Sequence, residues 1–352
     1  MKLCSLAFVR GTAAAAATVA FAVLATDAHA ERHLLEMSAS RVFTTPSRGL
    51  YDYKSVVTAV AMSPDGNLLA SAGDDHLIGL WDVGTGRLVR KLPSHEGWIR
   101  GLSFRPDGEH LASAGDDGRV VIWNVATGQM VRTIANAGEA AFDVAYSPDG
   151  SQLAAIGYSE HLRIYDTTNY RLTQTLTAPA RDMRALAFSP DGAFVATAGR
   201  QGKLRIWTAA DGQVVTDVKF GAAHLRAIAF SPDGTQVAVA GDGPQLGIFR
   251  VADGHEEQSI NIRPGKVLSL TYCGPGRLAT GQSDNLVRVW DLATGDELSH
   301  LVGHRGSVAA LEFLPDTQTL ISGSFDTTVR FWNVPSEGAP VTARRGEPTP
   351  AN

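Results

Sequence analysis

A period of 42 residues runs through most of this chain and strongly limits how it can fold. A Ser/Arg-Pro-Asp-Gly motif recurs at a constant spacing of 42, with its proline at Pro64, Pro106, Pro148, Pro190 and Pro232. An aromatic residue that closes a short apolar run recurs with five spacings of 42 and one of 41, at Trp81, Trp123, Tyr165, Trp207, Phe249, Trp290 and Trp332. Self-similarity at such a period marks stacked repeats, so these seven copies predict seven similar structural units.

Each repeat has the residue pattern of short β-strands. The positions three and one before the aromatic residue are always apolar, as with Ile78 and Leu80 before Trp81. This alternation with a period of two places the two apolar residues on one face of a strand and the aromatic residue on the other. Both faces must therefore be covered by neighbouring sheets. Pro-Asp-Gly and Thr-Gly turns interrupt the apolar runs, which predicts four short strands in each repeat.

The repeats resemble the WD40 family, also called the β-transducin-like repeats. The resemblance rests on the period, on Trp81-Asp82 and Trp290-Asp291, and on Gly303-His304. It covers about residues 57–334. It implies an all-β fold, a seven-bladed β-propeller built from seven repeats of about 42 residues.

The segments on either side of the repeats have separate expected roles. Residues 31–56 form an N-terminal segment in which Arg41 to Thr45 is a candidate strand for closing the ring. Val341 and Thr342 are the alternative, but nearby prolines make them weaker strand formers. Residues 335–352 are rich in glycine, proline and arginine, and we expect them to be a disordered tail.

The first thirty residues have the features of a cleavable signal peptide. Lys2 and Arg10 precede an uncharged, largely apolar stretch, and Ala28-His29-Ala30 supplies small residues for cleavage after Ala30. The alternative is an uncleaved anchor, which is disfavoured because spanning a bilayer takes about 20 apolar residues. We therefore expect an exported protein of bacterial type, periplasmic or secreted, without stable membrane insertion.

Charge and cysteine content exclude other classes of protein. The formal net charge of −5 provides no general attraction for phosphate backbones, so no nucleic-acid partner is expected. Cleavage after Ala30 removes Cys4 and leaves Cys273 as the one cysteine, so no intrachain disulfide is expected. Motifs for a nucleophile elbow, a phosphate-binding glycine loop and a zinc protease are missing from the sequence. We expect no catalytic residue, no metal and no cofactor.

The WD40 resemblance also implies a hydrogen-bonded chain of histidine, serine or threonine, aspartate and tryptophan within a blade. Two repeats carry all four residues at matching spacings: His95, Ser113, Asp117 and Trp123, then His304, Ser322, Asp326 and Trp332. The first and sixth repeats keep three members, and the third to fifth have lost the pattern: Ser71, Asp75 and Trp81, then Thr280, Asp284 and Trp290. This chain imitates a catalytic triad. Because satisfying buried polar groups is a sufficient reason for it, we interpret it as structural.

Counting along the repeats locates two sets of side chains that should surround the channel mouth. The first follows the residue that opens each inner strand: Thr58, Arg100, Phe142, Arg184, Arg226, Leu268 and Ala309. The second precedes the aspartate position of each turn: Asp74, Asp116, Tyr158, Arg200, Asp242, Ser283 and Phe325. In WD40 proteins such positions resemble a ring that grips peptides. Our candidate binding residues are the arginines and aromatic residues of this region, Trp98, Arg100, Phe142, Tyr158, Arg184, Arg200, Arg226 and Phe325.

These residues predict a monomeric scaffold that binds a protein or peptide at the channel face. Between Phe142 and Arg226 neither set contains an aspartate, which favours an acidic or C-terminal peptide. In the alternative interpretation Asp74 and Asp116 pair with Arg100 and leave a surface with its charges satisfied. A receptor for an anionic small molecule or a glycan is the second hypothesis. A hydrolase is the third, disfavoured because the axial acids are interleaved with arginines.

Overall fold

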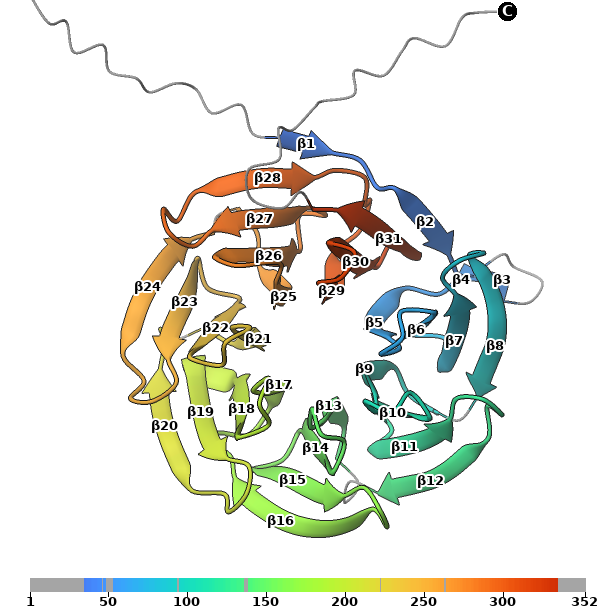
Figure 1. Ribbon diagram of the computed structural model, residues 1–352, viewed down its shortest axis with the longest axis horizontal. Coiled ribbons are helices and arrows are strands. Elements are labelled where there is room, and N and C mark those ends of the chain that lie inside the picture. Colours follow the sequence, from blue (N-terminus) through green and yellow to red (C-terminus); the bar gives the residue numbers. More distant parts are fainter. Residues whose placement is uncertain are drawn as a thin grey trace, which may run out of the picture. The chain divides into compact units, whose positions relative to one another are not determined.

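The alternating pattern of the repeats forms antiparallel blades of β-strands, which are arranged around a central axis as a propeller (Figure 1). The computed structural model describes residues 35–45, 47–48, 53–93, 95–135, 139–221, 223–262 and 264–334. The expected all-β, seven-bladed architecture is confirmed. In the part of the chain that is described, no helix is long and apolar enough to cross a membrane.

The blades follow one another around the ring in chain order. Blade 1 consists of β5 (Val57–Met62), β6 (Leu68–Gly73), β7 (Leu77–Asp82) and β8 (Arg87–Pro93). Blade 2 consists of β9 (Ile99–Phe104), β10 (His110–Gly115), β11 (Arg119–Asn124) and β12 (Met130–Ala135). Blade 3 consists of β13 (Ala141–Tyr146), β14 (Gln152–Gly157), β15 (His161–Asp166) and β16 (Arg171–Thr177). Blade 4 consists of β17 (Met183–Phe188), β18 (Phe194–Gly199), β19 (Lys203–Thr208) and β20 (Val214–Lys219), with a short 3-10 turn at Arg200–Gly202.

The remaining three blades complete the ring. Blade 5 consists of β21 (Leu225–Phe230), β22 (Gln236–Gly241), β23 (Gln245–Arg250) and β24 (Glu256–Asn261). Blade 6 consists of β25 (Val267–Tyr272), β26 (Arg277–Gln282), β27 (Val287–Asp291) and β28 (Glu297–Leu301). Blade 7 takes β29 (Val308–Leu314), β30 (Thr319–Ser324) and β31 (Thr328–Asn333) from the last repeat.

The N-terminal segment supplies the missing outer strand of blade 7. β2 (Arg41–Thr44) pairs antiparallel with β31. Phe43 of β2 is buried, with its ring centroid 4.9 Å from that of Phe331 and 5.8 Å from that of Trp81. Arg41 to Thr45, the candidate closing strand, therefore lies in the closing position, whereas Val341 and Thr342 lie outside the described residues.

A second N-terminal strand adds a feature that the repeat pattern did not predict. β1 (Leu35–Met37) pairs in parallel with β28 and becomes a fifth strand at the outer edge of blade 6 (Figure 1). β3 (Ser47–Arg48) and β4 (Tyr53–Lys54) pair with each other before blade 1. Residues 1–34, with the expected cleavage site at Ala30, and the expected tail from residue 335 are outside the described part.

The hydrophobic core repeats at each contact between blades. Ile78 and Leu80 pack against blade 2, in one cluster with Trp123. Trp81, on the opposite face of the same strand, packs instead in a cluster with Val329 and Phe331 of blade 7. The predicted two-faced strand is therefore confirmed. Burial of apolar area on both faces of every blade is the main source of the stability of the fold.

Candidate functional site

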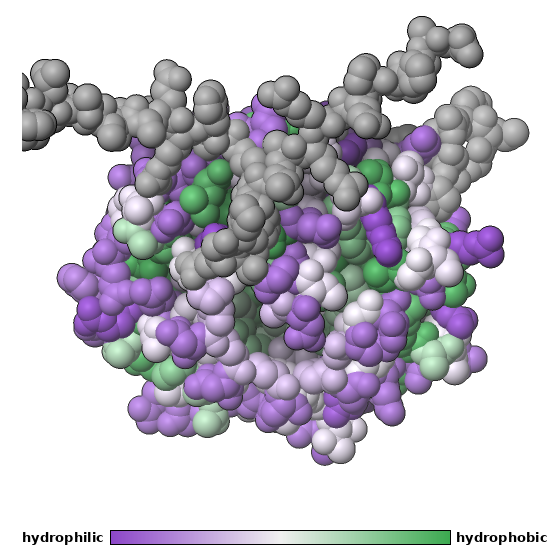
Figure 2. Space-filling model, turned by 45° about the horizontal axis from the view of Figure 1, so that its top comes forward, coloured by the Kyte–Doolittle hydropathy of each residue, from purple (hydrophilic) through white to green (hydrophobic). Residues whose placement is uncertain are grey.

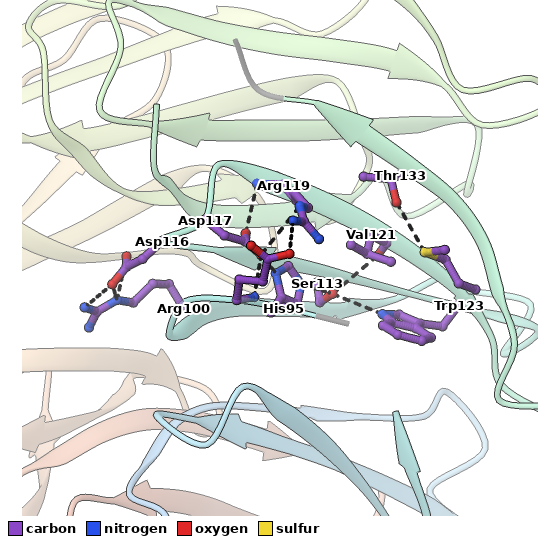
Figure 3. Close-up of polar contacts among 11 residues, drawn as sticks. His95, Arg100, Ser113, Asp116, Asp117, Arg119, Val121, Trp123 and Thr133 are labelled. Atoms are coloured by element: carbon purple, nitrogen blue, oxygen red, sulfur yellow. Dashed lines mark hydrogen bonds and ion pairs between the residues drawn. The ribbon is translucent and has the colours of Figure 1, made fainter. Parts of the chain in front are cut away.

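The polar chain of blade 2 is hydrogen-bonded along its whole length (Figure 3). The indole Nε1 of Trp123 donates to Ser113 Oγ at 3.1 Å. Ser113 Oγ lies 2.8 Å from His95 Nε2, and His95 Nδ1 lies 3.0 Å from the Asp117 carboxylate. Because an indole only donates and a carboxylate only accepts, the chain is consistent when the hydroxyl donates to Nε2 and Nδ1 carries the proton.

Blade 7 repeats this chain with shorter distances. Trp332 Nε1 donates to Ser322 Oγ at 2.8 Å, and that oxygen lies 2.7 Å from His304 Nε2. His304 Nδ1 lies 2.9 Å from Asp326 Oδ2. Burial acts to raise the pKa of Asp326, but the hydrogen bonds from His304, Thr328 and the backbone of Arg305 outweigh it and lower the pKa.

Blades 1 and 6 keep the hydrogen bond between the tryptophan and the hydroxyl. Trp81 donates to Ser71 at 2.8 Å, and Trp290 donates to Thr280 at 2.9 Å. In blade 6 the partner of the aspartate is Arg288, whose Nη2 lies 2.7 Å from Asp284 Oδ2. Arg288 is almost fully buried and occupies the variable position between the two apolar residues of β27. Comparison of the histidine positions of the repeats does not reveal this partner, because Arg288 lies on β27 and not before the inner strand.

Both serines of the complete chains are closed to solvent. Ser113 and Ser322 are 0% exposed, and each hydroxyl already contacts an indole and an imidazole. Burial lowers the pKa of His95, so its neutral form is favoured at neutral pH. A nucleophilic serine must reach its substrate, and these two do not. The geometry therefore supports a stabilising role for both chains.

The seven residues of the first counted set converge on one cavity. This cavity is open, has a volume of about 210 Å³ and is lined by residues of all seven blades, among them Thr58, Arg100, Phe142, Arg184, Arg226, Leu268 and Ala309. Figure 2 shows hydrophilic side chains around the hollow at the centre of one face. The side chains that were counted along the repeats thus lie together at the mouth of the channel.

Three of the arginines at the mouth already hold carboxylates. Arg100 donates to both carboxylate oxygens of Asp116, from Nε at 3.0 and 3.1 Å and from Nη2 at 2.7 Å, close to the polar chain of blade 2 (Figure 3). Arg226 binds Asp242 in the same way, at 2.7 and 3.1 Å. The alternative interpretation of a charge-satisfied surface therefore holds for Arg100 and Asp116. Asp74 behaves differently, because it accepts a hydrogen bond from the backbone N–H of Val56.

The sector from Phe142 to Arg226 contains a carboxylate that neither counted set includes. Arg184 Nε lies 2.5 Å from Asp182 Oδ1, and its guanidinium carbon lies 3.8 Å from the ring centroid of Phe142. Asp182 is buried, and its backbone φ of 63° is in the left-handed region. The two counted sets passed over Asp182 because it lies before β17, outside both positions.

The other candidate binding residues lie at strand ends around this cavity and do not line it. Tyr158 follows β14 and is 45% exposed, whereas Phe325 follows β30 and is 39% exposed. Arg200 is exposed, and no described acidic group forms an ion pair with it. Trp98 lies just before β9, where its ring contacts both Arg100 and Phe325. The structure therefore separates the residues that line the cavity from those that form its rim, Trp98, Tyr158, Arg200 and Phe325.

The sequence analysis missed two partly buried carboxyl groups in the channel wall. Asp143 accepts hydrogen bonds from the backbone N–H groups of Leu186 and Val144, and burial raises its pKa to about 7. Glu312 of blade 7 accepts a hydrogen bond from Met62 N of blade 1, and burial raises its pKa to about 8. Each carboxyl ties its own blade to the next one. Asp143 and Glu312 occupy two different strand positions, and each position carries an acid in one repeat only. The period of the repeats therefore does not mark them.

The described residues offer little that could hold a metal. Asp107, Glu109 and His110 bring their ligand atoms within 4.8 Å of one another, but the two acids are exposed. Asp107 also pairs with Arg105 at 3.2 Å. Burial raises the pKa of the Cys273 thiol to about 12, which disfavours the reactive thiolate.

Comparison with known families identifies the repeats. The WD domain, G-beta repeat family matches residues 45–82, 86–124, 170–208, 253–291 and 295–333, which together are more than half of the chain. The chain belongs to the WD40 repeat family. The repeats outside these matches end in Tyr165 and Phe249, where the other repeats have tryptophan. WD40 propellers generally bind proteins and are generally not catalytic.

Individual relatives match only short parts of this WD40 chain. A periodic tryptophan protein 2 homolog from Neurospora crassa is 40% identical over 58 residues, 16% of this chain and 6% of the relative. WD repeat and SOCS box-containing protein 1 from Danio rerio is 39% identical over 70 residues, 20% of this chain and 16% of the relative. Protein FIZZY-RELATED 1 from Arabidopsis thaliana is 44% identical over 54 residues, covering 15% and 11%. These relatives are eukaryotic, so they give no support to an export of bacterial type.

Proposed function

We propose that this WD40 propeller is an exported scaffold that binds a protein or peptide at the mouth of its channel. The observation that carries the proposal is the convergence of one variable side chain from each of the seven blades on a single open cavity. The polar chains that imitate a catalytic site are occupied by hydrogen bonds inside the blades. Variable side chains on a rigid frame are the usual arrangement of a recognition surface.

The binding face can be tested with a photocrosslinker placed on either face of the propeller. Arg200 lies in the turn between β18 and β19, whereas Thr168 lies in the turn between β15 and β16, and these turns are at opposite ends of the blades. Both residues are exposed. On a Cys4→Ser background, Arg200→Cys and Thr168→Cys each provide one accessible thiol, because Cys273 is buried.

We expect a specific protein to crosslink to the label at position 200 and not to the label at position 168. The label is attached to purified protein, which is then mixed with the exported fraction and irradiated. Identical products from both positions would show that the channel mouth is not the recognition surface.

Export itself is a separate part of the proposal. The apolar stretch after Arg10 and the Ala28-His29-Ala30 site support it. β1 begins at Leu35, so cleavage after Ala30 would leave both N-terminal strands of the propeller intact. N-terminal sequencing of the native protein is expected to begin at Glu31, and a mature protein that retains Lys2 would contradict export by this route. We also infer a monomer, which light scattering of the mature protein tests.

The small-molecule hypothesis has less support. The cavity of about 210 Å³ is smaller than the roughly 300–1,000 Å³ of ordinary ligand pockets. An anionic ligand or a glycan would also have to compete with Asp116, Asp182 and Asp242 for the arginines. A protein partner can bury the rim as well as the cavity, so it fits this face better.

A further inference from the structure

Two aromatic residues from different blades meet at the rim of the channel mouth. Trp98 precedes β9 of blade 2, and Phe325 follows β30 of blade 7. Their ring centroids are 6.4 Å apart with an interplanar angle of 74°, an edge-to-face contact. Blade 1 lies between blades 2 and 7 in the ring (Figure 1), so the pair spans blade 1.

This aromatic pair remains accessible despite the contact. Phe325 is 39% exposed, although other large aromatic side chains of the blades, such as Trp332, are fully buried. Trp98 is partly exposed, and the guanidinium carbon of Arg100 lies 4.8 Å from its ring centroid. Because Arg100 is also held by Asp116, the Trp98 ring is fixed on one side by a rigid partner. A fixed, half-exposed aromatic surface loses little entropy when it binds.

The turn that carries Phe325 also has a backbone conformation that is unfavourable for one of its residues. Thr327 has a φ of 74°, a left-handed conformation that β-branched residues adopt at a cost. Blade 2 has Asp116 and Gly118 where blade 7 has Phe325 and Thr327. Folding therefore does not require an exposed phenylalanine here, since Ser283 occupies the same position in blade 6. Strain beside an exposed apolar residue is a reason to look for a binding function.

The arginines that line the cavity argue against recognition of an acidic group there. Arg100, Arg184 and Arg226 each contact an aspartate within 3.1 Å. Lys266 adds a second cation, 3.5 Å from Asp242. An acidic peptide would have to displace these carboxylates, whereas an apolar side chain can bury Trp98 and Phe325 without breaking an ion pair. A few buried anchor residues, aromatic ones above all, also contribute most of the binding free energy in many interfaces.

We infer that Trp98 and Phe325 form the anchor of the binding site, and that the partner is a peptide segment that inserts a bulky apolar side chain against them. This inference rests on the proposed function and specifies its partner. It replaces the acidic or C-terminal peptide that the arginines alone had suggested.

The test uses a library of random dodecamer peptides displayed on phage and selected on the immobilised full chain. Peptides enriched by the wild type are synthesised, and their Kd is measured on two variants. Phe325→Ser removes the anchor and introduces the residue that blade 6 has at this position. Leu172→Ser is the control, because Leu172 is also an exposed apolar residue, 51% exposed, but lies on the outer strand β16, away from the lining and the rim of the mouth.

We expect the enriched peptides to share a leucine, isoleucine, phenylalanine or tryptophan at one position. Phe325→Ser should raise their Kd at least tenfold, as for other anchor residues, and Leu172→Ser should change it less than threefold. Equal thermal unfolding midpoints of the two variants exclude a folding defect as the cause. Trp98→Ser provides an independent variant with the same expected loss.

Two other results would overturn the inference, and they are distinguishable. If peptides are enriched, and a polyethylene glycol label on Arg200→Cys blocks them while Phe325→Ser does not weaken them, the mouth is the site but the anchor is wrong. Enrichment of acidic peptides that lose binding at high salt has the same meaning. If the wild type enriches no peptide, or the label does not block binding, the proposed function itself fails.

Discussion

Blades 2 and 7 differ from blades 3 and 5 in how they fill the same positions of the same strands. In blade 2, Ser113 and Trp123 belong to a buried polar chain, whereas blade 3 has Ala155 and Tyr165 and blade 5 has Val239 and Phe249. All these residues are at most 5% exposed. The second strand has the same burial pattern in all four blades. The blade therefore does not need the polar chain in order to form.

The difference between the two kinds of blade follows their position in the ring. The hydrogen bond between tryptophan and a hydroxyl is present in blades 6, 7, 1 and 2, which are consecutive. This half contains the junction between blade 7 and blade 1, where β2 closes the ring. Blades 3 to 5 follow one another without such a junction. We therefore expect the polar ties to support the part of the ring that is closed by non-contiguous strands.

The largest expected effect comes from breaking the chain of blade 2. Asp117→Ala leaves His95 Nδ1 and the backbone N–H groups of Glu96 and Arg119 without their acceptor. We expect a loss of about 3 kcal/mol in the free energy of unfolding, since each buried unsatisfied donor costs about 1–3 kcal/mol. The matched change in blade 3, Ser159→Ala, removes hydrogen bonds with the backbone of His161 and a long contact of 3.5 Å from Arg163, and it should cost less than about 1 kcal/mol.

Urea unfolding monitored by tryptophan fluorescence measures both variants. Peptide binding at low temperature should be unchanged in both, because neither residue is in the anchor. Equal losses of stability in the two blades would show that the polar chain is not a specific support. A stable Asp117→Ala variant without binding would contradict the structural role of the chain.

The next effect separates two kinds of buried acid by pH. The pKa of Asp326 is lowered, so its contribution to stability is present above its unfolded pKa of 3.8 and is lost as pH falls through the folded value. The pKa of Glu312 is raised from 4.5 to about 8. Between these values the folded protein keeps a proton that the unfolded chain releases, so the free energy of unfolding falls as pH rises.

Glu312→Gln should remove this dependence, because an amide keeps an oxygen for the Met62 N–H and does not titrate. We expect the variant to be more stable than the wild type at pH 9 by about 2 kcal/mol, and equally stable near pH 4. Asp326→Asn should instead lower stability at pH 7. Midpoints of thermal unfolding at pH 4, 6 and 9 measure both. A constant difference for Glu312→Gln across this range would refute the titration of Glu312 at the blade junction.

The sequence predicts what the period controls and misses what depends on single repeats. The polar chains follow from fixed offsets, because residues such as His95 and Ser113 lie on neighbouring elements of one blade. The residues that line the mouth can be predicted from fixed offsets in the repeat for the same reason. Asp182, Glu312 and the parallel strand β1 each occur once, so no repetition marks them. The contact between Trp98 and Phe325 joins two blades across a third, and it depends on side-chain directions that no spacing contains.

The smallest expected effect concerns the same turn in blades 2 and 7. Gly118 in blade 2 has a φ of 76°, and Thr327 at the same position in blade 7 has a φ of 74°. This left-handed conformation favours glycine, but in blade 7 a β-branched residue adopts it. Thr327→Asn should raise the free energy of unfolding by about 0.5–1 kcal/mol, because asparagine adopts this conformation more readily, as Asn285 does in blade 6 at 73°. Gly118→Thr, the reverse change, should cost more than this gain, since a Cβ at Gly118 would lie 2.9 Å from the carbonyl oxygen of Glu139. Thermal unfolding of both variants tests the pair. If Thr327→Asn is stabilising and weakens peptide binding, the strained turn also positions Phe325, whereas a stabilised variant with unchanged affinity would limit the role of Thr327 to the cost it adds to folding.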